Sequence, residues 1–290
     1  MSFELHRPTN IAEALGLATR LGAAARFIAG GTDLVVQINR GRATPQHVID
    51  ISHLSDLSRD IRQTADGFSL GALTHYRSIE RHPAFQDALK ALPEAASVVG
   101  GVQVRNIASI GGNIINASPA ADFVPALLAL DAELEIQGST GSRRALLHDF
   151  ILGPGKTDLR PGEILTQVHF KSPAANSATA FLKEGRRKAM EISVVCVAAC
   201  LTLAADGKTC QAARIVVGAA APKAYRCEAA ETALIGKPAD AETFRAAAQL
   251  AAAQAAPISD VRASAEHRRH LVGVLVQRAL EICRQRIAGV

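Results

Sequence analysis

Two Gly-Gly elements constrain what this chain can fold into. Ala29-Gly30-Gly31 directly follows the apolar pair Phe27-Ile28, and Gly111-Gly112 lies further along within a Ser-Ile-Gly-Gly-Asn segment. Glycine adopts positive φ and lets a ligand approach the backbone closely. Successive backbone N–H groups can then form a concave nest for an anion such as a diphosphate. Gly-Gly pairs are also common in ordinary tight turns, so the residues alone indicate candidate phosphate-binding loops and nothing narrower.

Polar side chains accompany both glycine pairs. Thr32, Ser109 and Asn113 add hydrogen-bond donors beside the glycines. An ionised Asp33 would repel a phosphate, so we expect it to cap a helix or to accept a hydrogen bond from a ribose hydroxyl. The GxGxxG fingerprint of dinucleotide-binding βαβ units does not occur in the chain.

A third glycine segment, Gly153-Pro154-Gly155-Lys156-Thr157, contains the GKT of a P-loop. A P-loop needs another glycine five residues before Gly155, where this chain has Phe150. Pro154 also lacks an amide that a phosphate cradle would use. We predict a turn that leads into the next strand.

Composition narrows the functional class. The chain has 290 residues, 48% of them hydrophobic, which suits two packed domains. No apolar run reaches the ~20 residues of a membrane helix, and the N-terminus lacks the features of a signal peptide, so we expect a soluble, cytoplasmic protein. Aromatic residues make up 4% and Trp is absent, which argues against nucleic-acid binding.

The cysteines give no sign of a metal centre. Five cysteines, an odd number, argue against a full disulfide framework. No CxxC occurs, nor any spacing typical of an iron–sulfur or zinc site. We therefore predict no metal ligands here, so any such cluster would come from another chain.

Segment patterns indicate an α+β organisation. Asn10 and Glu13 predict a helix start, residues 83–100 read as a single helix, and the second glycine pair reads as a loop before a short helix near 122–129. Beyond a polar linker at 171–178, apolar strands precede two Ala-rich helices near 241–255 and 264–288. Six Arg and two Glu fall between Arg262 and Arg286, which predicts a solvated helix face or a contact with an acidic partner.

Four segments together resemble the FAD-binding subunits of the xanthine dehydrogenase and carbon monoxide dehydrogenase family of molybdenum hydroxylases. They are AGGTDL, RNIASIGGNIINASPAADFVPALLALDAELEI, GPGKT and FLKEGRRKAMEIS, and the likeness covers essentially the whole chain. The last two point towards the xanthine dehydrogenase side of the family.

The resemblance implies a fold. Residues 1–172 would form an FAD-binding domain of the vanillyl-alcohol-oxidase type, with α+β subdomains at about 1–53 and 54–172. Residues 178–290 would form the smaller α/β C-terminal domain of the flavin subunit.

The resemblance also implies a set of cofactor-binding residues. The first loop would cradle the diphosphate of FAD and the second would contact it from the other side. Asp122 would bind ribose or adenine-side hydroxyls, Leu165 would lie near the isoalloxazine, and Lys183 would bond flavin carbonyl oxygens. From the residues alone, Asp122 could instead cap the following helix and Lys183 could be a solvated strand-end lysine. The full set is Arg26, Phe27, Ile28, Ala29, Gly30, Gly31, Thr32, Asp33, Ser109, Ile110, Gly111, Gly112, Asn113, Asn116, Asp122, Leu165 and Lys183.

Two positions depart from the family pattern. Where some relatives place an aromatic residue on the flavin ring, this chain has only Val98 or Val99, and Met190-Glu191 stands where several relatives have two acids. These departures leave the surroundings of the flavin ring open.

The function implied is electron transfer. A large molybdopterin subunit would hydroxylate the substrate, and two 2Fe–2S clusters on a small subunit would pass electrons to the FAD here and on to NAD+ or another acceptor. A dimer of such heterotrimers is expected, and no catalytic nucleophile or base is predicted in this chain. A stand-alone flavin-dependent NAD(P)H oxidoreductase and a flavin-free nucleotide-binding module are the alternatives.

Overall fold

The N-terminal part of the chain is a small parallel sheet with flanking helices. The structure, a computed structural model, describes residues 2–187 and 189–289. Strands β1 and β2 both pair in parallel with β3, which gives the order β1-β3-β2. Helix α1 begins as predicted, because the Asn10 side chain accepts from the N–H of Glu13. The elements are β1 (Glu4–His6), α1 (Ile11–Leu21), the 3-10 helix η1 (Gly22–Ala24), β2 (Ala25–Ile28), α2 (Leu34–Asn39) and β3 (His47–Asp50).

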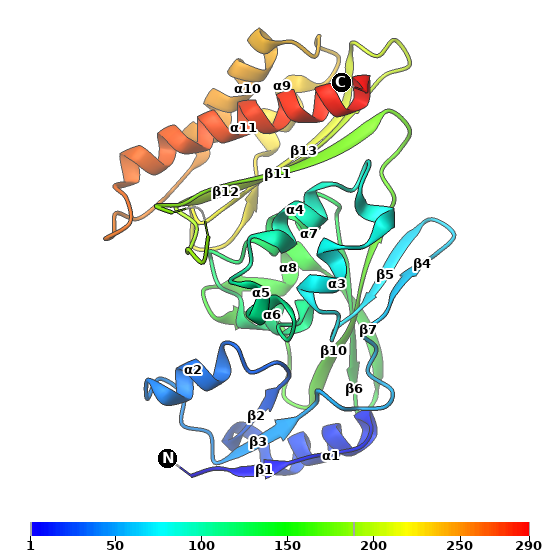
Figure 1. The fold of residues 1–290 in the computed structure, drawn as a ribbon, viewed down its shortest axis with the longest axis vertical. Coiled ribbons are helices and arrows are strands. Elements are labelled where there is room, and N and C mark those ends of the chain that lie inside the picture. Colours follow the sequence, from blue (N-terminus) through cyan, green and yellow to red (C-terminus); the bar gives the residue numbers. More distant parts are fainter. Residues whose placement is uncertain (1, 188, 290) are drawn as a thin grey trace.

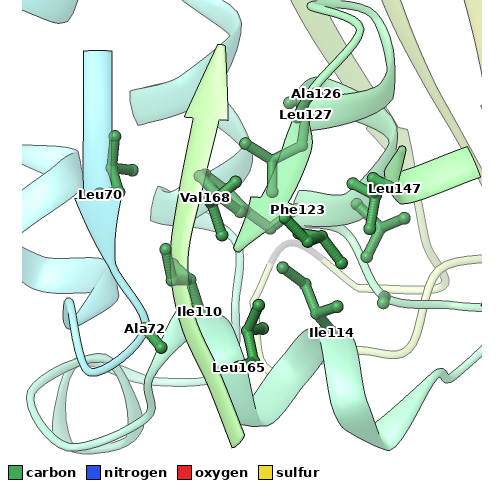
Figure 2. Close-up of a cluster of buried hydrophobic side chains, with 14 of the residues drawn as sticks. Leu70, Ala72, Ile110, Ile114, Phe123, Ala126, Leu127, Leu147, Leu165 and Val168 are labelled. Atoms are coloured by element: carbon green, nitrogen blue, oxygen red, sulfur yellow. The ribbon is translucent and has the colours of Figure 1, made fainter. Parts of the chain in front are cut away.

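The central part is a five-stranded antiparallel sheet with short helices packed on it (Figure 1). The strand order is β4-β5-β10-β6-β7, and Figure 2 shows Ile110, Phe123 and Leu165 among the buried side chains of its core. The elements are β4 (Ile61–Gln63), β5 (Gly67–Gly71), α3 (Tyr76–Glu80), the 3-10 helix η2 (Pro83–Phe85), α4 (Ala91–Ser97), α5 (Val102–Arg105), α6 (Ile110–Asn116), α7 (Phe123–Leu128), β6 (Glu133–Gly138), β7 (Gly141–Leu146), α8 (Leu147–Phe150), β8 (Ile151–Gly153), β9 (Lys156–Thr157) and β10 (Glu163–Lys171).

Two expectations for this part are wrong. The single helix expected at 83–100 is interrupted: α4 begins only two residues before Pro93, since proline is tolerated in a first helical turn and breaks a helix interior. The second glycine pair does not form a loop but lies in the first turn of α6, whose N-cap is Ser109. The turn predicted at Gly155 is confirmed, because it joins β8 to β9 with φ +66°.

The C-terminal part is an antiparallel sheet in the order β11-β12-β13-β14, covered on one face by helices (Figure 1). The two predicted Ala-rich helices are confirmed as α10 and α11. Residues 172–176, between β10 and β11, belong to no strand or helix, and the two-domain boundaries themselves stay a prediction. The elements are β11 (Ser177–Glu184), β12 (Val195–Leu203), β13 (Cys210–Gly218), β14 (Tyr225–Arg226), α9 (Glu228–Leu234), α10 (Ala241–Gln254) and α11 (Ala265–Ala288).

Strand β12 joins the two cores. Its residues alternate between faces, as in any strand. Val197 and Ala199 pack with the helices of the C-terminal part, whereas Cys196 and Cys200 pack into the core of the central part. This two-sided burial explains the nearly unbroken apolar sequence of the strand.

Two arginines of the C-terminal charge cluster bond to other groups of the protein: Arg268 bonds within the C-terminal part, and Arg286 joins that part to the central part. Arg268 is 3% exposed and donates to the carbonyls of Val194 and Ala219 at 2.7 and 3.0 Å. Arg286 of α11 pairs with Glu94 of α4. The expectation of a solvated face is therefore wrong for Arg268, because carbonyls left over at strand ends need buried donors. Among the described residues, no helix combines the length and the apolar character that a membrane span requires.

Candidate functional site

A cavity of about 770 Å3 opens between the N-terminal sheet and the central part. Its walls include the two predicted glycine elements, and a short stretch of the C-terminal part completes them. Ile110 and Lys183 do not line it, since Ile110 is fully buried in the central core (Figure 2) and Lys183 is bonded to other groups. The predicted residues that do line the cavity are Arg26, Phe27, Ile28, Ala29, Gly30, Gly31, Thr32, Asp33, Ser109, Gly111, Gly112, Asn113, Asn116, Asp122 and Leu165.

The first glycine element packs against Ile107 and Ala108, which directly precede the second. A Cβ on Gly30 would lie 2.0 Å from the carbonyl oxygen of Ile107 and 3.2 Å from the N of Ala108. The backbone of the first element therefore packs directly on the residues that lead into α6. Only glycine allows this approach, and residues of both glycine elements line the cavity.

The first element also presents free backbone donors. Gly31 has φ +70°, in the region that favours glycine. Within residues 2–187 and 189–289, the backbone N–H groups of residues 30–33 make no backbone hydrogen bond. An anion is the partner that such a run of unpaired amides favours.

The second element is fixed by the segment that follows β5. The N–H of Ile110 donates to Thr74 O at 3.0 Å, and the N–H of Gly111 donates to Ala72 O at 2.9 Å. A Cβ on Gly111 would lie 2.8 Å from Ala72 O, so this glycine permits the close packing of α6. Ser109 caps the helix by accepting from the N–H of Gly112 at 3.2 Å.

Two asparagines of α6 line the cavity, and only one of them has a hydrogen-bond partner for its side-chain oxygen among the described residues. The Oδ1 of Asn113 is buried and has no hydrogen-bond partner among the described residues. Asn116 accepts from the side chain of Gln37 on α2 at 3.2 Å, which ties the N-terminal part to the central part across the cavity. A buried acceptor without a donor is costly, so Asn113 is well placed to receive a donor from a bound molecule.

Asp122 and Lys183 form a buried ion pair at the edge of the cavity. Lys183 Nζ lies 2.7 Å from Asp122 Oδ2, and Ser193 Oγ donates to Oδ1. Burial raises the pKa of the Asp122 carboxyl, and Lys183 and then Ser193 oppose that rise. Asp122 precedes α7, but its side chain makes no capping hydrogen bond there. Both carboxylate oxygens of Asp122 thus have partners within the chain.

Lys183 also bonds to the segment 190–192, which forms the part of the cavity wall that comes from the C-terminal part. Its Nζ donates to the carbonyl of Glu191 at 2.7 Å and to that of Val98 at 3.4 Å. Met190, Glu191 and Ile192 line the cavity from the connection between β11 and β12. Lys183 therefore fixes this connection beside the cavity instead of pointing into it.

Tyr76 is a cavity residue that the sequence analysis did not identify. It is 1% exposed, it packs edge-on against Phe123 with ring centroids 5.2 Å apart, and its hydroxyl lacks a partner among the described residues. Burial, with Asp122 and Asp33 nearby, raises its pKa well above the ordinary value. Burial also raises the pKa of Asp33. Tyrosine is rare in this chain, and the sequence around Tyr76 carries no other signal.

The β8–β9 turn and an aliphatic segment complete the walls. Gly155 lines the cavity, and its N–H donates to the carbonyl of Ala117 at the end of α6. Val99 lines the cavity and Val98 does not. Val99, Leu165 and Ile192 add aliphatic side chains to the lining, which suits a largely apolar ring system.

The amino-acid sequence matches two models of one family of proteins along nearly the whole chain. Residues 1–173 match the family model described as the FAD-binding domain in molybdopterin dehydrogenase, and residues 180–282 match that of the CO dehydrogenase flavoprotein C-terminal domain. The chain belongs to this family of flavin subunits. The predicted family and fold class are confirmed.

Individual relatives agree with this placement. The xanthine dehydrogenase FAD-binding subunit of Escherichia coli O157:H7 is 34% identical, with 95% of this chain and 94% of the relative covered. The nicotinate dehydrogenase FAD-subunit of Eubacterium barkeri is 37% identical, with 84% and 83% covered. A solved chain of carbon monoxide dehydrogenase from Hydrogenophaga pseudoflava has a TM-score of 0.94 at 33% identity, with 99% and 98% covered.

Proposed function

We propose that this chain carries FAD in the cavity and is the electron-transfer subunit of a heteromeric molybdenum hydroxylase. The observation that carries the proposal is the close packing of Gly30 on Ile107, two residues before the second glycine element, beside a run of unpaired amides at residues 30–33. A diphosphate would accept from the amides of residues 30–33 on one side, with Ser109 and Gly112 of α6 on the other.

The other walls fit the remainder of a dinucleotide. The unpartnered Asn113 Oδ1 and the Tyr76 hydroxyl supply an acceptor and a donor for hydroxyl groups. Asp33, which lacks a capping bond on α2, is a further acceptor for a ribose hydroxyl. Leu165 would pack near the ring system. A cavity of about 770 Å3 is within the usual range for a cofactor of this kind.

Lys183 contributes through other residues in this proposal. Its three contacts are to Asp122, Glu191 and Val98. Since these hold the wall formed by residues 190–192, Lys183 positions that wall against the flavin ring. A direct bond from Lys183 to a flavin carbonyl, as the family resemblance implies, would require one of these contacts to be exchanged.

Bound FAD supplies the two-electron and one-electron transfers of flavin chemistry, whereas the protein supplies binding, orientation and electrostatics. We infer that electrons arrive from two 2Fe–2S clusters on a small partner subunit, fed by a molybdopterin site on a large one, and leave to NAD+ or another acceptor. We also propose a dimer of heterotrimers in the cytoplasm.

The substrate of the complex is not selected by this chain. Relatives of similar identity belong to enzymes named for xanthine, for nicotinate and for carbon monoxide. Substrates so different are consistent with recognition on the large subunit.

Co-purification tests the proposal. The chain is expressed with its genomic neighbours, and molybdenum, iron and flavin are assayed across a gel-filtration profile. We expect all three to elute together. A chain that retains FAD alone and oxidises NADH without co-purifying metal would show the stand-alone oxidoreductase instead, and a colourless chain that binds nucleotide would show a flavin-free module.

A further inference from the structure

Three side chains of the N-terminal sheet meet on one face, away from the cavity. Glu4 and His6 belong to β1, and His47 begins β3. The parallel register pairs Glu4 with His47. Residues two apart on a strand share a face, so Glu4, His6 and His47 all project from the same side of the sheet.

The possible ligand atoms of these residues lie close together. His6 Nε2 is 3.1 Å from His47 Nδ1, and each ring nitrogen is near a Glu4 carboxylate oxygen, at 3.8 Å for His6 and 3.4 Å for His47. A tetrahedral zinc site with bonds of 2.0–2.2 Å requires ligand atoms about 3.3–3.6 Å apart. The spacing therefore suits a shared cation with little movement.

The three side chains differ in how far they are exposed to solvent. The His6 and His47 side chains are 16% and 23% exposed, whereas Glu4 is 66% exposed. The two rings are tilted by 46° with centroids 5.2 Å apart. The open side at Glu4 leaves room for water as a fourth ligand, which is usual where the protein provides three.

We propose that Glu4, His6 and His47 bind a divalent transition-metal cation of the zinc class. Two imidazoles with one carboxylate suit zinc, nickel or copper, whereas magnesium and calcium prefer oxygen ligands alone. The sequence spacing does not reveal this site, because His6 and His47 are 41 residues apart.

The bound cation would stabilise the pairing of the edge strand β1 with β3. β1 has three residues, and in the described part of the chain it pairs with no strand other than β3, in the order β1-β3-β2. Strand β2 leads into the first glycine element. None of the three ligands lines the cavity. The cation therefore has a structural role that is separate from electron transfer, and it stabilises the folded state by binding to it selectively.

Metal titration of the full chain tests the site. The flavin-loaded chain is freed of metal with a chelator and titrated with Zn2+ in competition with a chromogenic chelator. We expect one equivalent to bind, with the urea midpoint rising as it does. His6→Gln and His47→Gln should each lower the affinity more than about 100-fold, since removing even an outer-shell partner costs 10–100-fold. His148→Gln, at an exposed histidine of α8, should change neither result.

Two results would overturn the site. One is a chain that takes up no Zn2+ under these conditions. The other is a His47→Gln variant that binds Zn2+ as the native chain does, because the cation would then sit elsewhere, for example on a cysteine. Urea unfolding in chelator checks that each variant folds. Flavin absorbance should be the same in every sample, so failure of this site leaves the flavin proposal untouched.

Discussion

The Nζ of Lys183 lies 2.7 Å from the Oδ2 of Asp122. Lys183 belongs to β11 of the C-terminal part, and Asp122 precedes α7 of the central part. The two side chains are 10% and 9% exposed, so the pair is shielded from solvent at the junction of the two parts and the cavity. A buried pair of this kind costs much when one charge is left alone.

Lys183→Met should therefore lower the free energy of unfolding by about 3–5 kcal/mol, because it leaves the Asp122 carboxylate buried without its cation. The double variant Lys183→Met with Asp122→Asn should lose much less than the sum of the two single losses. Urea unfolding at neutral pH measures both. Lys208→Met, at an exposed lysine, should change stability by less than about 0.5 kcal/mol. Purely additive losses in the cycle would show that the pair is not coupled.

Gly31 and Gly41 form a matched pair for testing the cavity. Their φ angles are +70° and +67°, so a Val at either position carries similar backbone strain. That strain is about 1–2 kcal/mol for a residue with a Cβ. Gly31 lines the cavity, whereas a Cβ on Gly41 would have nothing within 4 Å.

We expect Gly31→Val to abolish FAD retention, because its Cβ would lie 3.2 Å from the side chains of Ile28 and Val35 and would displace the loop that carries the unpaired amides. Gly41→Val should keep its flavin, because it carries the same backbone strain without any close side-chain contact. Flavin absorbance after gel filtration measures retention. Normal occupancy in Gly31→Val would count decisively against the proposed site.

Much of the fold could be predicted from local patterns. The Asn10 cap, the strand that leads into the first glycine pair and the two Ala-rich helices are encoded by neighbouring residues. The start of α6 is different. Glycines disfavour helix interiors, so residues 110–116 read as a loop, yet hydrogen bonds from Ile110 and Gly111 to the segment after β5 fix the helix there.

The candidate site was predictable where its residues lie in glycine motifs. It was not predictable where long-range packing decides what faces the cavity. Ile110 is buried in the core and does not line the cavity. Tyr76 of α3 lines it, and so does Glu191, whose carbonyl accepts a hydrogen bond from Lys183. None of these placements follows from spacing along the chain.

The lowered pKa of Asp260 in the C-terminal part predicts that the free energy of unfolding depends on pH. Burial opposes ionisation of Asp260, but the N–H of Arg262 and the guanidinium of Arg268 outweigh it and lower the pKa from 3.8 to about 2. A folded-state pKa below the unfolded value stabilises the protein above the unfolded pKa, and this stabilisation disappears as the pH falls through the folded one. The relevant window therefore runs from about pH 4 down to about pH 2.

Asp260→Asn should destabilise the chain at pH 6, because it removes the charge that Arg268 pairs with at 2.7 Å. The difference between native chain and variant should shrink as the pH is lowered through that window. Urea midpoints at successive pH values measure it. Two curves that stay parallel down to the lowest pH at which both fold would show that Asp260 contributes nothing to the acid sensitivity.

Asn113 offers a test in which stability and binding change separately. Its buried Oδ1 has no partner among the described residues, and leaving such an acceptor unpaired costs about 1–3 kcal/mol. Asn113→Ala removes that penalty, so the chain stripped of flavin should unfold at the same urea concentration or at a higher one. A hydrogen bond to FAD would be lost as well, which should weaken FAD binding by about tenfold. Fluorescence titration with FAD measures the affinity.

The control is Asn106→Ala, at an exposed residue after α5, which should alter neither the urea midpoint nor the FAD affinity. If Asn113→Ala binds FAD as tightly as the native chain, the acceptor does not face the cofactor, and a loss of stability without flavin would mean that it has a partner within the protein.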